Sequence, residues 1–269
     1  MTPVRHKLLA ALAAVPLLLL TAATPAPAAA TGYVALGDSY AAGVAAGAYD
    51  PASGDCHRST RAYPALLAAQ AGSAPFLDLA CNGATSEDVL TNQVPSIPAG
   101  TGLVTLTAGG NDLGFADAVI ACLQPFTTDA KCYQALDHSA QVARDDLPGR
   151  VDRLLDGIGR AAPGARVVVT GYPDLLHTGT TCFVGTDARR KRFDALTDQV
   201  DALLQQRAQA HGDRFADPRG SFADHEICAA HGTEWITRIV LTPLWESFHP
   251  TAEGQAHGYL PVVAAAVGG

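Results

Sequence analysis

The chain lacks long apolar runs after residue 30, because no later stretch reaches the length that a membrane-spanning helix needs. Its one extended apolar run lies near the N-terminus, at residues 8–21, and follows the basic residues Arg5 and Lys7. Small residues at 26–30 come next and resemble a signal-peptidase site. A short apolar run between a basic start and small residues is typical of a secretory signal peptide.

We therefore expect residues 1–30 to be a signal peptide, cleaved near Ala28 or Ala30, and the mature chain to be secreted and extracellular. We expect no integral membrane segment in the mature chain. Residues 31–269 show no internal repeat, charged tail or linker, and their length fits a single α/β domain with a sizeable core. We expect this domain to be a monomer.

Positive charge is also scarce: 18 Lys and Arg stand against 26 Asp and Glu, which gives a net charge of −8 at pH 7. Loss of the basic N-terminal segment makes the chain more acidic still. A nucleic-acid partner requires a basic patch, which binds phosphates. The one basic cluster, residues 189–192, begins a helical pattern and is expected to be a solvated helix face. The sequence therefore argues against nucleic acid as a partner.

The closely spaced cysteine pairs of zinc sites are absent as well, because no two of the six cysteines are near enough in the sequence. The group His225, Glu226 and His231 matches no standard zinc spacing. We therefore expect no metal and no other cofactor.

Six cysteines in an exported chain are expected to form three disulfides, because the compartment that the chain enters is oxidising. The sequence leaves the connectivity open, and we favour pairing of neighbours in sequence order. The favoured pairs are Cys56–Cys81, Cys122–Cys132 and Cys182–Cys228.

Short apolar runs recur along the chain and are separated by helical patterns, which implies a parallel sheet with helices on both faces. The run 167–169 is β-branched without alternation, as in a strand that is buried on both faces. We therefore predict an α/β fold, a doubly wound sandwich whose central sheet has about five strands. The predicted strands are 33–36, 76–79, 103–107, 166–170 and 214–216, and the clearest predicted helices are 62–71, 142–158 and 187–211.

Two segments, 109–137 and 172–186, are rich in Gly, Pro, Thr and Asp. This composition favours turns, so we predict long loops after the third and fourth strands. Each segment contains at least one cysteine, and we expect the disulfides to fix both loops.

Ligands of an open α/β sheet bind beyond the carboxyl ends of the strands. Ser39, Gly83 and Asn111 each follow a predicted strand, and His249 precedes the last helical pattern. Ser39 is a candidate nucleophile with His249 as its general base and acid, and Glu246 lies near enough in sequence to orient His249. The backbone N–H groups of Ser39 and Gly83 and the side-chain amide of Asn111 are candidates for an oxyanion hole.

Four short segments match, in order, the four blocks of the SGNH, or GDSL, hydrolase superfamily: 37–39 (Gly-Asp-Ser), Gly83, 109–112 (Gly-Gly-Asn-Asp) and 249–250 (His-Pro). The chain from Tyr33 onward resembles the secreted bacterial GDSL lipases and esterases. This resemblance implies a flavodoxin-like α/β/α sandwich, the SGNH hydrolase fold, and hydrolysis of carboxylic esters without a metal. Similar members have three sequential disulfides, which supports the favoured pairing. A G-x-S-x-G motif is absent, which argues against the α/β-hydrolase fold.

The resemblance leaves the acid open. Much of the superfamily has an aspartate where this chain has Glu246, some close relatives have a glutamate there, and others orient the histidine with a main-chain carbonyl.

We therefore predict a secreted serine esterase or lipase that hydrolyses acyl-lipid esters through a covalent acyl-enzyme on Ser39. A phospholipase or a polysaccharide acetylesterase on the same scaffold is the alternative. A non-catalytic extracellular binding domain is less favoured because Ser39, Asn111 and His249 are all present. A phosphate-binding flavodoxin-like protein is less favoured because Asp38 would repel a phosphate.

Overall fold

A computed structural model of the 269-residue chain describes residues 1–2, 32–72, 75–123, 127–229 and 233–269. The expected signal peptide lies outside these residues except for Met1 and Thr2, so it stays an expectation. His231, a member of the weak His/Glu group, also lies outside them.

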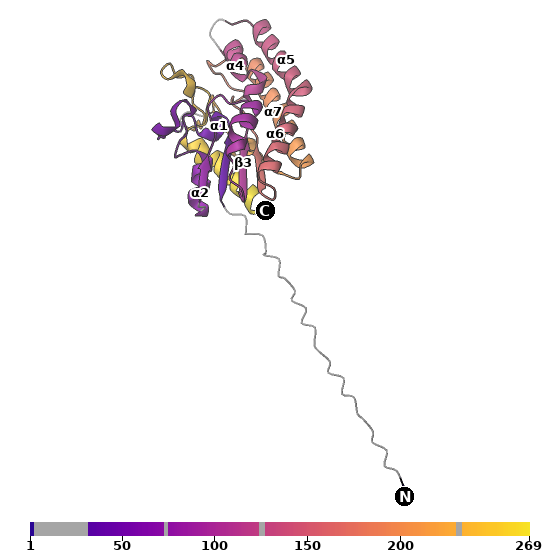
Figure 1. Ribbon diagram of the computed structural model, residues 1–269. Coiled ribbons are helices and arrows are strands. Elements are labelled where there is room, and N and C mark those ends of the chain that lie inside the picture. The colour runs from indigo at the N-terminus through magenta and orange to yellow at the C-terminus, as the bar shows by residue number, and fades with distance from the viewer. Residues whose placement is uncertain (3–31, 73–74, 124–126, 230–232) are drawn as a thin grey trace.

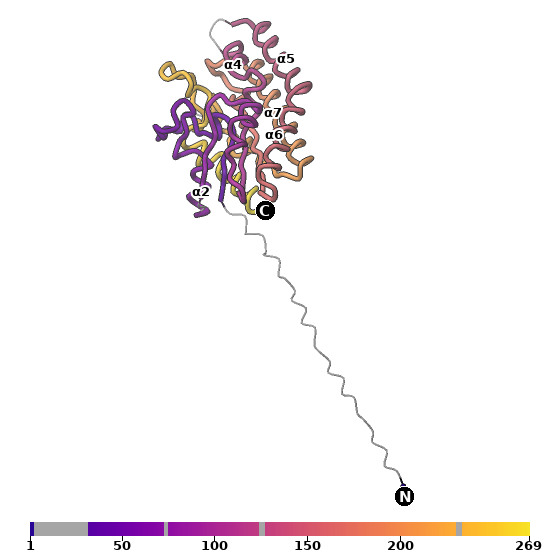
Figure 2. Tube along the Cα trace, in the orientation of Figure 1, coloured from indigo at the N-terminus to yellow at the C-terminus, as the bar shows by residue number. Residues whose placement is uncertain are grey.

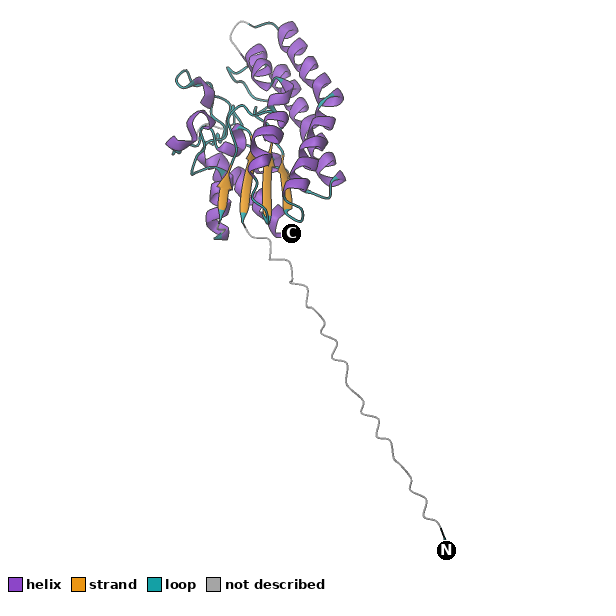
Figure 3. Cartoon of the chain, in the orientation of Figure 1, coloured by secondary structure: helices purple, strands orange, loops and turns teal. Residues whose placement is uncertain are grey.

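A five-stranded parallel sheet forms the centre of the domain, with strand order β2-β1-β3-β4-β5 (Figure 3). This order confirms the predicted doubly wound α/β fold, and every predicted strand is present with ends shifted by no more than one residue. The strands are β1 (Tyr33–Gly37), β2 (Phe76–Asp78), β3 (Leu103–Thr107), β4 (Arg166–Thr170) and β5 (Arg214–Ala216).

Helices cover both faces of the sheet. Helices α2 and α9 pack against each other on one side, and α6 and α7 pack together on the other, with α5 beside them (Figure 1). The helices are α1 (Ser39–Ala42), α2 (Tyr63–Ala71), α3 (Ser86–Asp88), α4 (Phe115–Leu123), α5 (Asp129–Asp145), α6 (Leu147–Ala161), α7 (Asp187–Ala210), α8 (Arg219–Phe222) and α9 (Leu260–Gly268). None of the described helices is both long and apolar enough to cross a bilayer.

The prediction of a loop over residues 109–137 is wrong for most of its length. After the 3₁₀ turn η4 (Asn111–Leu113), helix α4 is followed by α5, which begins within the predicted loop. The polar residues that suggested turns lie at helix ends: Thr128 caps α5 by accepting a hydrogen bond from the Lys131 N–H at 3.3 Å. The buried side of α5 includes Ser139 and Ala143, small side chains that give a weak apolar signal.

The segment 172–186 has no helix or strand, which confirms the predicted loop. The predicted helix 142–158 is divided, because α5 ends at Asp145 and α6 begins at Leu147.

All three disulfides join the cysteines in sequence order, which confirms the favoured connectivity. Cys56–Cys81 joins the turn η1 (Pro51–Cys56) to the segment that follows β2. Cys122–Cys132 joins α4 to α5. Cys182–Cys228 fixes the loop after β4, as expected.

Buried hydroxyl groups link the carboxyl ends of the central strands. The hydroxyl of Thr107, at the end of β3, lies 2.6 Å from the Thr170 hydroxyl on β4 and 2.9 Å from the Tyr63 hydroxyl on α2. The Thr107 carbonyl accepts a hydrogen bond of 2.9 Å from the N–H of Asp38. Because these groups are fully buried and paired, they fix the backbone at the edge of the sheet where the site lies.

Candidate active site

Ser39 lies at the first position of α1, two residues after the end of β1. Gly37 makes this turn possible: its φ is 134°, and a side chain there would overlap the Thr107 carbonyl of the neighbouring strand. Asp38 is the N-cap residue, and its carboxylate accepts a hydrogen bond of 2.9 Å from the Tyr40 N–H. The Gly-Asp-Ser segment is therefore a turn, as its composition suggests, and it presents Ser39 at the carboxyl end of β1.

His249 meets Ser39 from the other end of the chain. Its Nε2 lies 2.7 Å from the Ser39 Oγ, and its Nδ1 lies 2.9 Å from the Ser247 carbonyl oxygen. A carbonyl only accepts hydrogen bonds, so Nδ1 carries the proton and Nε2 accepts one from the serine hydroxyl. Desolvation lowers the pKa of His249 to about 4, although the Ser247 and Glu246 carbonyls partly oppose this shift. The imidazole is therefore neutral at pH 7 and able to take the serine proton.

The sequence leaves open whether the Glu246 carboxylate or a main-chain carbonyl orients His249; in the structure, this carboxylate bonds Tyr49 and the Ser247 carbonyl contacts His249. The Glu246 Oε1 accepts a hydrogen bond of 2.6 Å from the Tyr49 hydroxyl, which itself accepts one of 2.9 Å from the Ala45 N–H. The cause is the local backbone: Glu246 ends the 3₁₀ turn η5 (Leu244–Glu246), and Ser247 that follows is extended. Phe248 then adopts a left-handed φ of 64°. This path directs the Ser247 carbonyl to His249 and leaves the Glu246 side chain on Tyr49.

Phe248 is held in this conformation by Tyr40. The Tyr40 hydroxyl donates a hydrogen bond of 2.9 Å to the Phe248 carbonyl, and the Tyr40 ring centroid lies 5.2 Å from that of His249. A non-glycine residue with positive φ is uncommon and persists only where neighbouring contacts fix it. Tyr40 therefore connects helix α1, which carries the candidate nucleophile Ser39, to the turn 247–249 that carries His249.

Gly83 and Asn111 lie at the same edge of the sheet as Ser39. The turn that contains Gly83 begins where the Cys81 N–H donates to the Gly37 carbonyl at 3.0 Å. The Asn111 side-chain amide donates a hydrogen bond of 3.0 Å to the Ala84 carbonyl, which joins the loop after β3 to this turn. Gly83 has a φ of 78° and open space where a side chain would be. The three candidate oxyanion donors are thus carried by three turns that are hydrogen-bonded to one another.

Three further residues position this site, and sequence reasoning missed all of them. The Tyr172 hydroxyl donates to Asp38 at 2.6 Å and accepts from the Gly110 N–H at 3.0 Å. The Gln93 side chain bonds both the N–H and the carbonyl of Gly37, each at 2.8 Å. Gln255 accepts from the Tyr63 N–H at 2.8 Å and donates to the Tyr40 carbonyl at 3.0 Å. A single polar residue in a loop or helical pattern carries no sequence signal for such a role.

Asp38 is buried beneath this network. Burial is the main cause that raises the pKa of its carboxyl to about 7, and hydrogen bonds from Tyr172 and from the backbone of Tyr40 limit the rise. These donors, and not a cation, stabilise the carboxylate, so Asp38 depends on the Tyr172 hydroxyl.

Aromatic side chains lie beside the turn that leads to His249. Trp245 stacks on His57 with ring centroids 3.8 Å apart and an angle of 7° between the planes, and its ring lies 5.3 Å from that of Tyr49. Trp235, in contrast, stacks on His225. Trp245 is thus the tryptophan on the Glu246–Tyr49 side of the site.

A metal site is not formed by the residues that the structure describes, since none of their His, Cys, Asp and Glu side chains make a group of three that could hold an ion. His225 and Glu226 have other partners: the Nδ1 of His225 lies 2.6 Å from the Thr233 carbonyl oxygen, and Glu226 pairs with His177 at 3.1 Å.

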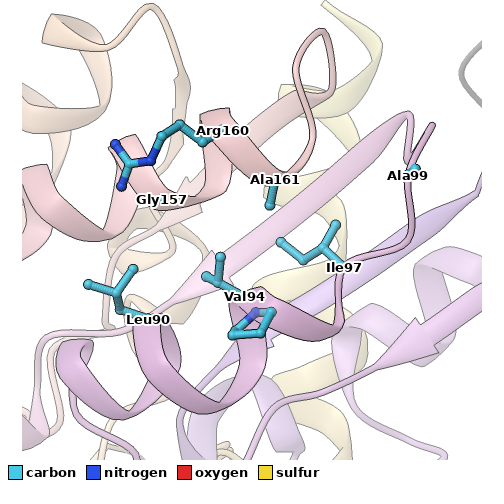
Figure 4. Close-up of a pocket in the computed structure, with 8 residues that line it drawn as sticks. Leu90, Val94, Ile97, Ala99, Gly157, Arg160 and Ala161 are labelled. Carbon is cyan, nitrogen blue, oxygen red and sulfur yellow. The ribbon is translucent and has the colours of Figure 1, made fainter.

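An open hollow of about 450 Å³ lies elsewhere, between α6 and the segment 89–99 (Figure 4). None of the candidate catalytic or oxyanion residues lines it, so it is separate from the site. Its lining residues are Leu90, Val94, Pro95, Ile97, Ala99, Gly157, Arg160 and Ala161.

A parallel α/β/α sandwich with a serine–histidine pair at the carboxyl edge of its sheet defines a serine hydrolase of the SGNH type. Comparison with known families agrees: the model of the GDSL-like Lipase/Acylhydrolase family matches residues 35–257. The chain belongs to this family and is a carboxylic ester hydrolase.

Several lipases are similar to the chain over most of its length. It is 43% identical over 243 residues to Lipase 1 of Streptomyces coelicolor, covering 90% of this chain and 89% of that protein. Among solved structures, phospholipase A1 from Streptomyces albidoflavus NA297 superposes with a TM-score of 0.84 at 41% identity, covering 88% of this chain and 99% of the other. The extracellular lipase from Streptomyces rimosus superposes with a TM-score of 0.83 at 43% identity and the same coverage.

Proposed function

We propose that this ester hydrolase is a lipase that cleaves acyl-lipid esters through a covalent acyl-enzyme on Ser39. The observation that carries the proposal is the 2.7 Å contact between the Ser39 Oγ and the His249 Nε2, with the Nδ1 side fixed by a carbonyl. This arrangement supplies a nucleophile and an oriented neutral base without a carboxylate partner.

In the first half of the reaction, the His249 Nε2 removes the hydroxyl proton while the Ser39 Oγ attacks the ester carbonyl. The Ser247 carbonyl stabilises the imidazolium that forms, because the Nδ1 proton already points at it. The same proton then passes from Nε2 to the departing alcohol. Water attacks the acyl-enzyme in the second half, with His249 again as base, and releases the acid and Ser39.

The developing oxyanion would be bound by the backbone N–H groups of Ser39 and Gly83 and by the Asn111 amide. The Ser39 N–H lies at the start of a helix, where backbone donors have no intrahelical partner. Asn111 uses one amide proton on Ala84 and retains a second. Loss of one such donor typically lowers turnover by about 10²–10³-fold.

Phospholipid acyl esters are a second candidate substrate, because one similar solved structure is a phospholipase A1. A polysaccharide acetylesterase remains the alternative from the sequence. We propose further that the protein is an extracellular monomer; the N-terminal signal pattern and the three disulfides support an extracellular location.

A rate profile over ester chain length tests the proposed substrate class, with phosphatidylcholine and acetylated xylan as comparisons. We expect kcat/KM to favour medium or long acyl chains over acetyl esters. Activity confined to acetyl groups would reject the lipase assignment, and the profile of a Ser39→Ala variant provides the blank.

A further inference from the structure

Residues 238–245, here called the apolar loop, expose three large apolar side chains: Ile239 at 56%, Leu241 at 86% and Leu244 at 61%. The described part of the chain has other exposed large apolar residues at Met1, Leu77, Ile120 and Phe183, but these lie on separate segments. Single exposed apolar residues are ordinary, whereas a cluster indicates an interaction surface.

The apolar loop is joined directly to the catalytic histidine. The Thr237 N–H donates to the His249 carbonyl at 2.9 Å, and the Phe248 N–H donates to the Thr237 carbonyl at 2.8 Å. Closer to the tip, the Val240 N–H donates to the Ser247 hydroxyl at 2.8 Å. The two ends of the loop therefore meet beside His249, and the loop extends from the rim of the site.

The loop also projects from the body of the protein. In Figures 1 and 2, the gold part of the chain, which the bar places near residue 240, stands out at the upper left beside the indigo segment near residue 50. The segment that carries the exposed Ile239, Leu241 and Leu244 side chains thus stands away from the body of the protein.

Charge is nearly absent from this loop. Its one ionic side chain, Arg238, is paired with Glu234 through a hydrogen bond of 2.8 Å from the guanidinium Nε. The chain as a whole is acidic, with a net charge of −8. A surface of this kind is suited to an apolar partner without negative charge, because the loop itself offers no unpaired cation to attract an anionic one.

We propose that the apolar loop inserts into the surface of an uncharged or zwitterionic lipid aggregate and holds the mouth of the active site against it. This inference rests on the proposed lipase function, because acyl-lipid esters are gathered in such a surface. Insertion would remove the Leu241 and Leu244 side chains from water. Burial of one leucine side chain favours transfer from water into an apolar phase by about tenfold or more. Insertion would also bring His249, which lies at the base of the loop, close to the lipid surface that contains the substrate.

The test compares the double variant Leu241→Ser, Leu244→Ser with Leu77→Ser, the same change at an exposed leucine on the edge strand β2. Binding to phosphatidylcholine vesicles is measured by sedimentation in a Ser39→Ala background, which prevents hydrolysis. Hydrolysis of p-nitrophenyl acetate in solution is measured with Ser39 present, and thermal unfolding shows whether each variant is folded.

We expect the double variant to bind the vesicles at least tenfold more weakly, with kcat/KM on the soluble ester within about twofold of the parent. The control variant should match the parent in both. Unchanged vesicle binding in the double variant, or no binding by the parent, would overturn the proposal. Equal binding of the parent to phosphatidylglycerol and phosphatidylcholine vesicles would also overturn it. The same holds if the parent is a dimer and the double variant is a monomer. Failure of the parent to hydrolyse any ester would instead reject the proposed function, and the vesicle measurements do not depend on it.

Discussion

The Tyr172 hydroxyl donates a 2.6 Å hydrogen bond to the carboxylate of Asp38, the residue directly before the proposed nucleophile, Ser39. The same hydroxyl accepts the N–H of Gly110, the residue directly before Asn111. One side chain from the loop after β4 therefore joins the turn before Ser39 to the loop that carries Asn111. Tyr172 is a positioning residue in this arrangement.

Tyr172→Phe should lower kcat by on the order of 10- to 100-fold with little change in KM, because Ser39 and Asn111 would no longer be held in a fixed position relative to each other. It should also reduce the free energy of unfolding by about 1–3 kcal/mol, the usual cost of leaving a buried hydrogen-bonding group without its partner. Steady-state kinetics on a soluble ester and denaturant unfolding measure both effects. Tyr133→Phe, on α5, is the matched control and should change neither. A Tyr172→Phe enzyme that loses stability but keeps its kcat would show that the bond has only a structural role.

Glu246→Ala should lower kcat/KM by less than about tenfold, because the Ser247 carbonyl and not this carboxylate orients His249. Tyr49→Phe removes the other half of the same hydrogen bond, so the double variant should be no worse than the poorer single variant. Ser39→Ala should lose essentially all activity by comparison. If Glu246→Ala were as inactive as Ser39→Ala, the carboxylate would be the triad acid after all.

The pH profile should reflect the low pKa of His249. Since the base must be neutral, the first increase in kcat/KM should come as the pH rises through about 4. The unfolded chain binds a proton on this histidine below its ordinary pKa, and the native chain does so only near 4, so this residue's contribution to stability declines as the pH falls through that window. Circular dichroism at each pH therefore separates acid unfolding from titration. A midpoint near 6.5, the usual histidine value, would contradict the burial of His249.

Removal of the Cys56–Cys81 disulfide should lower turnover in protein that is still folded. The bond holds the segment that leads to Gly83 against η1, and the Asn82 N–H donates to the Cys56 carbonyl at 3.2 Å. Changing both cysteines to alanine should cost about 3–4 kcal/mol of stability and also reduce kcat. The control removes Cys182–Cys228, which should cost similar stability and leave kcat nearly unchanged. Parallel loss of activity and of folded protein along a denaturant titration would refute a role in positioning.

Much of the fold could be predicted because strands buried on both faces have a strong signal. The run 167–169 became the centre of β4, and each predicted strand was found. Helix α5 could not be predicted, since its buried side contains small and polar residues such as Ser139. There, tertiary packing and the Cys122–Cys132 disulfide decide the structure more than hydrophobic periodicity does.

The candidate site, too, is predictable only in part. Short motifs predict Ser39 and His249 as partners, and the two side chains are in contact. The role of the Ser247 carbonyl was open in the sequence, because every residue has a carbonyl and only the backbone path decides where it points. Gln93, Tyr172 and Gln255 act through long-range hydrogen bonds, which no local pattern encodes.

Covalent labelling of Ser39 is the most direct test of the proposed mechanism. The enzyme is inactivated with a phosphonate ester, digested, and mapped by mass spectrometry alongside a His249→Ala variant. We predict one phosphonyl group per chain on Ser39, formed at the rate at which activity is lost, and far slower labelling of the variant. Inactivation with the adduct on another residue, or with no adduct, would contradict the assignment of Ser39 as the nucleophile.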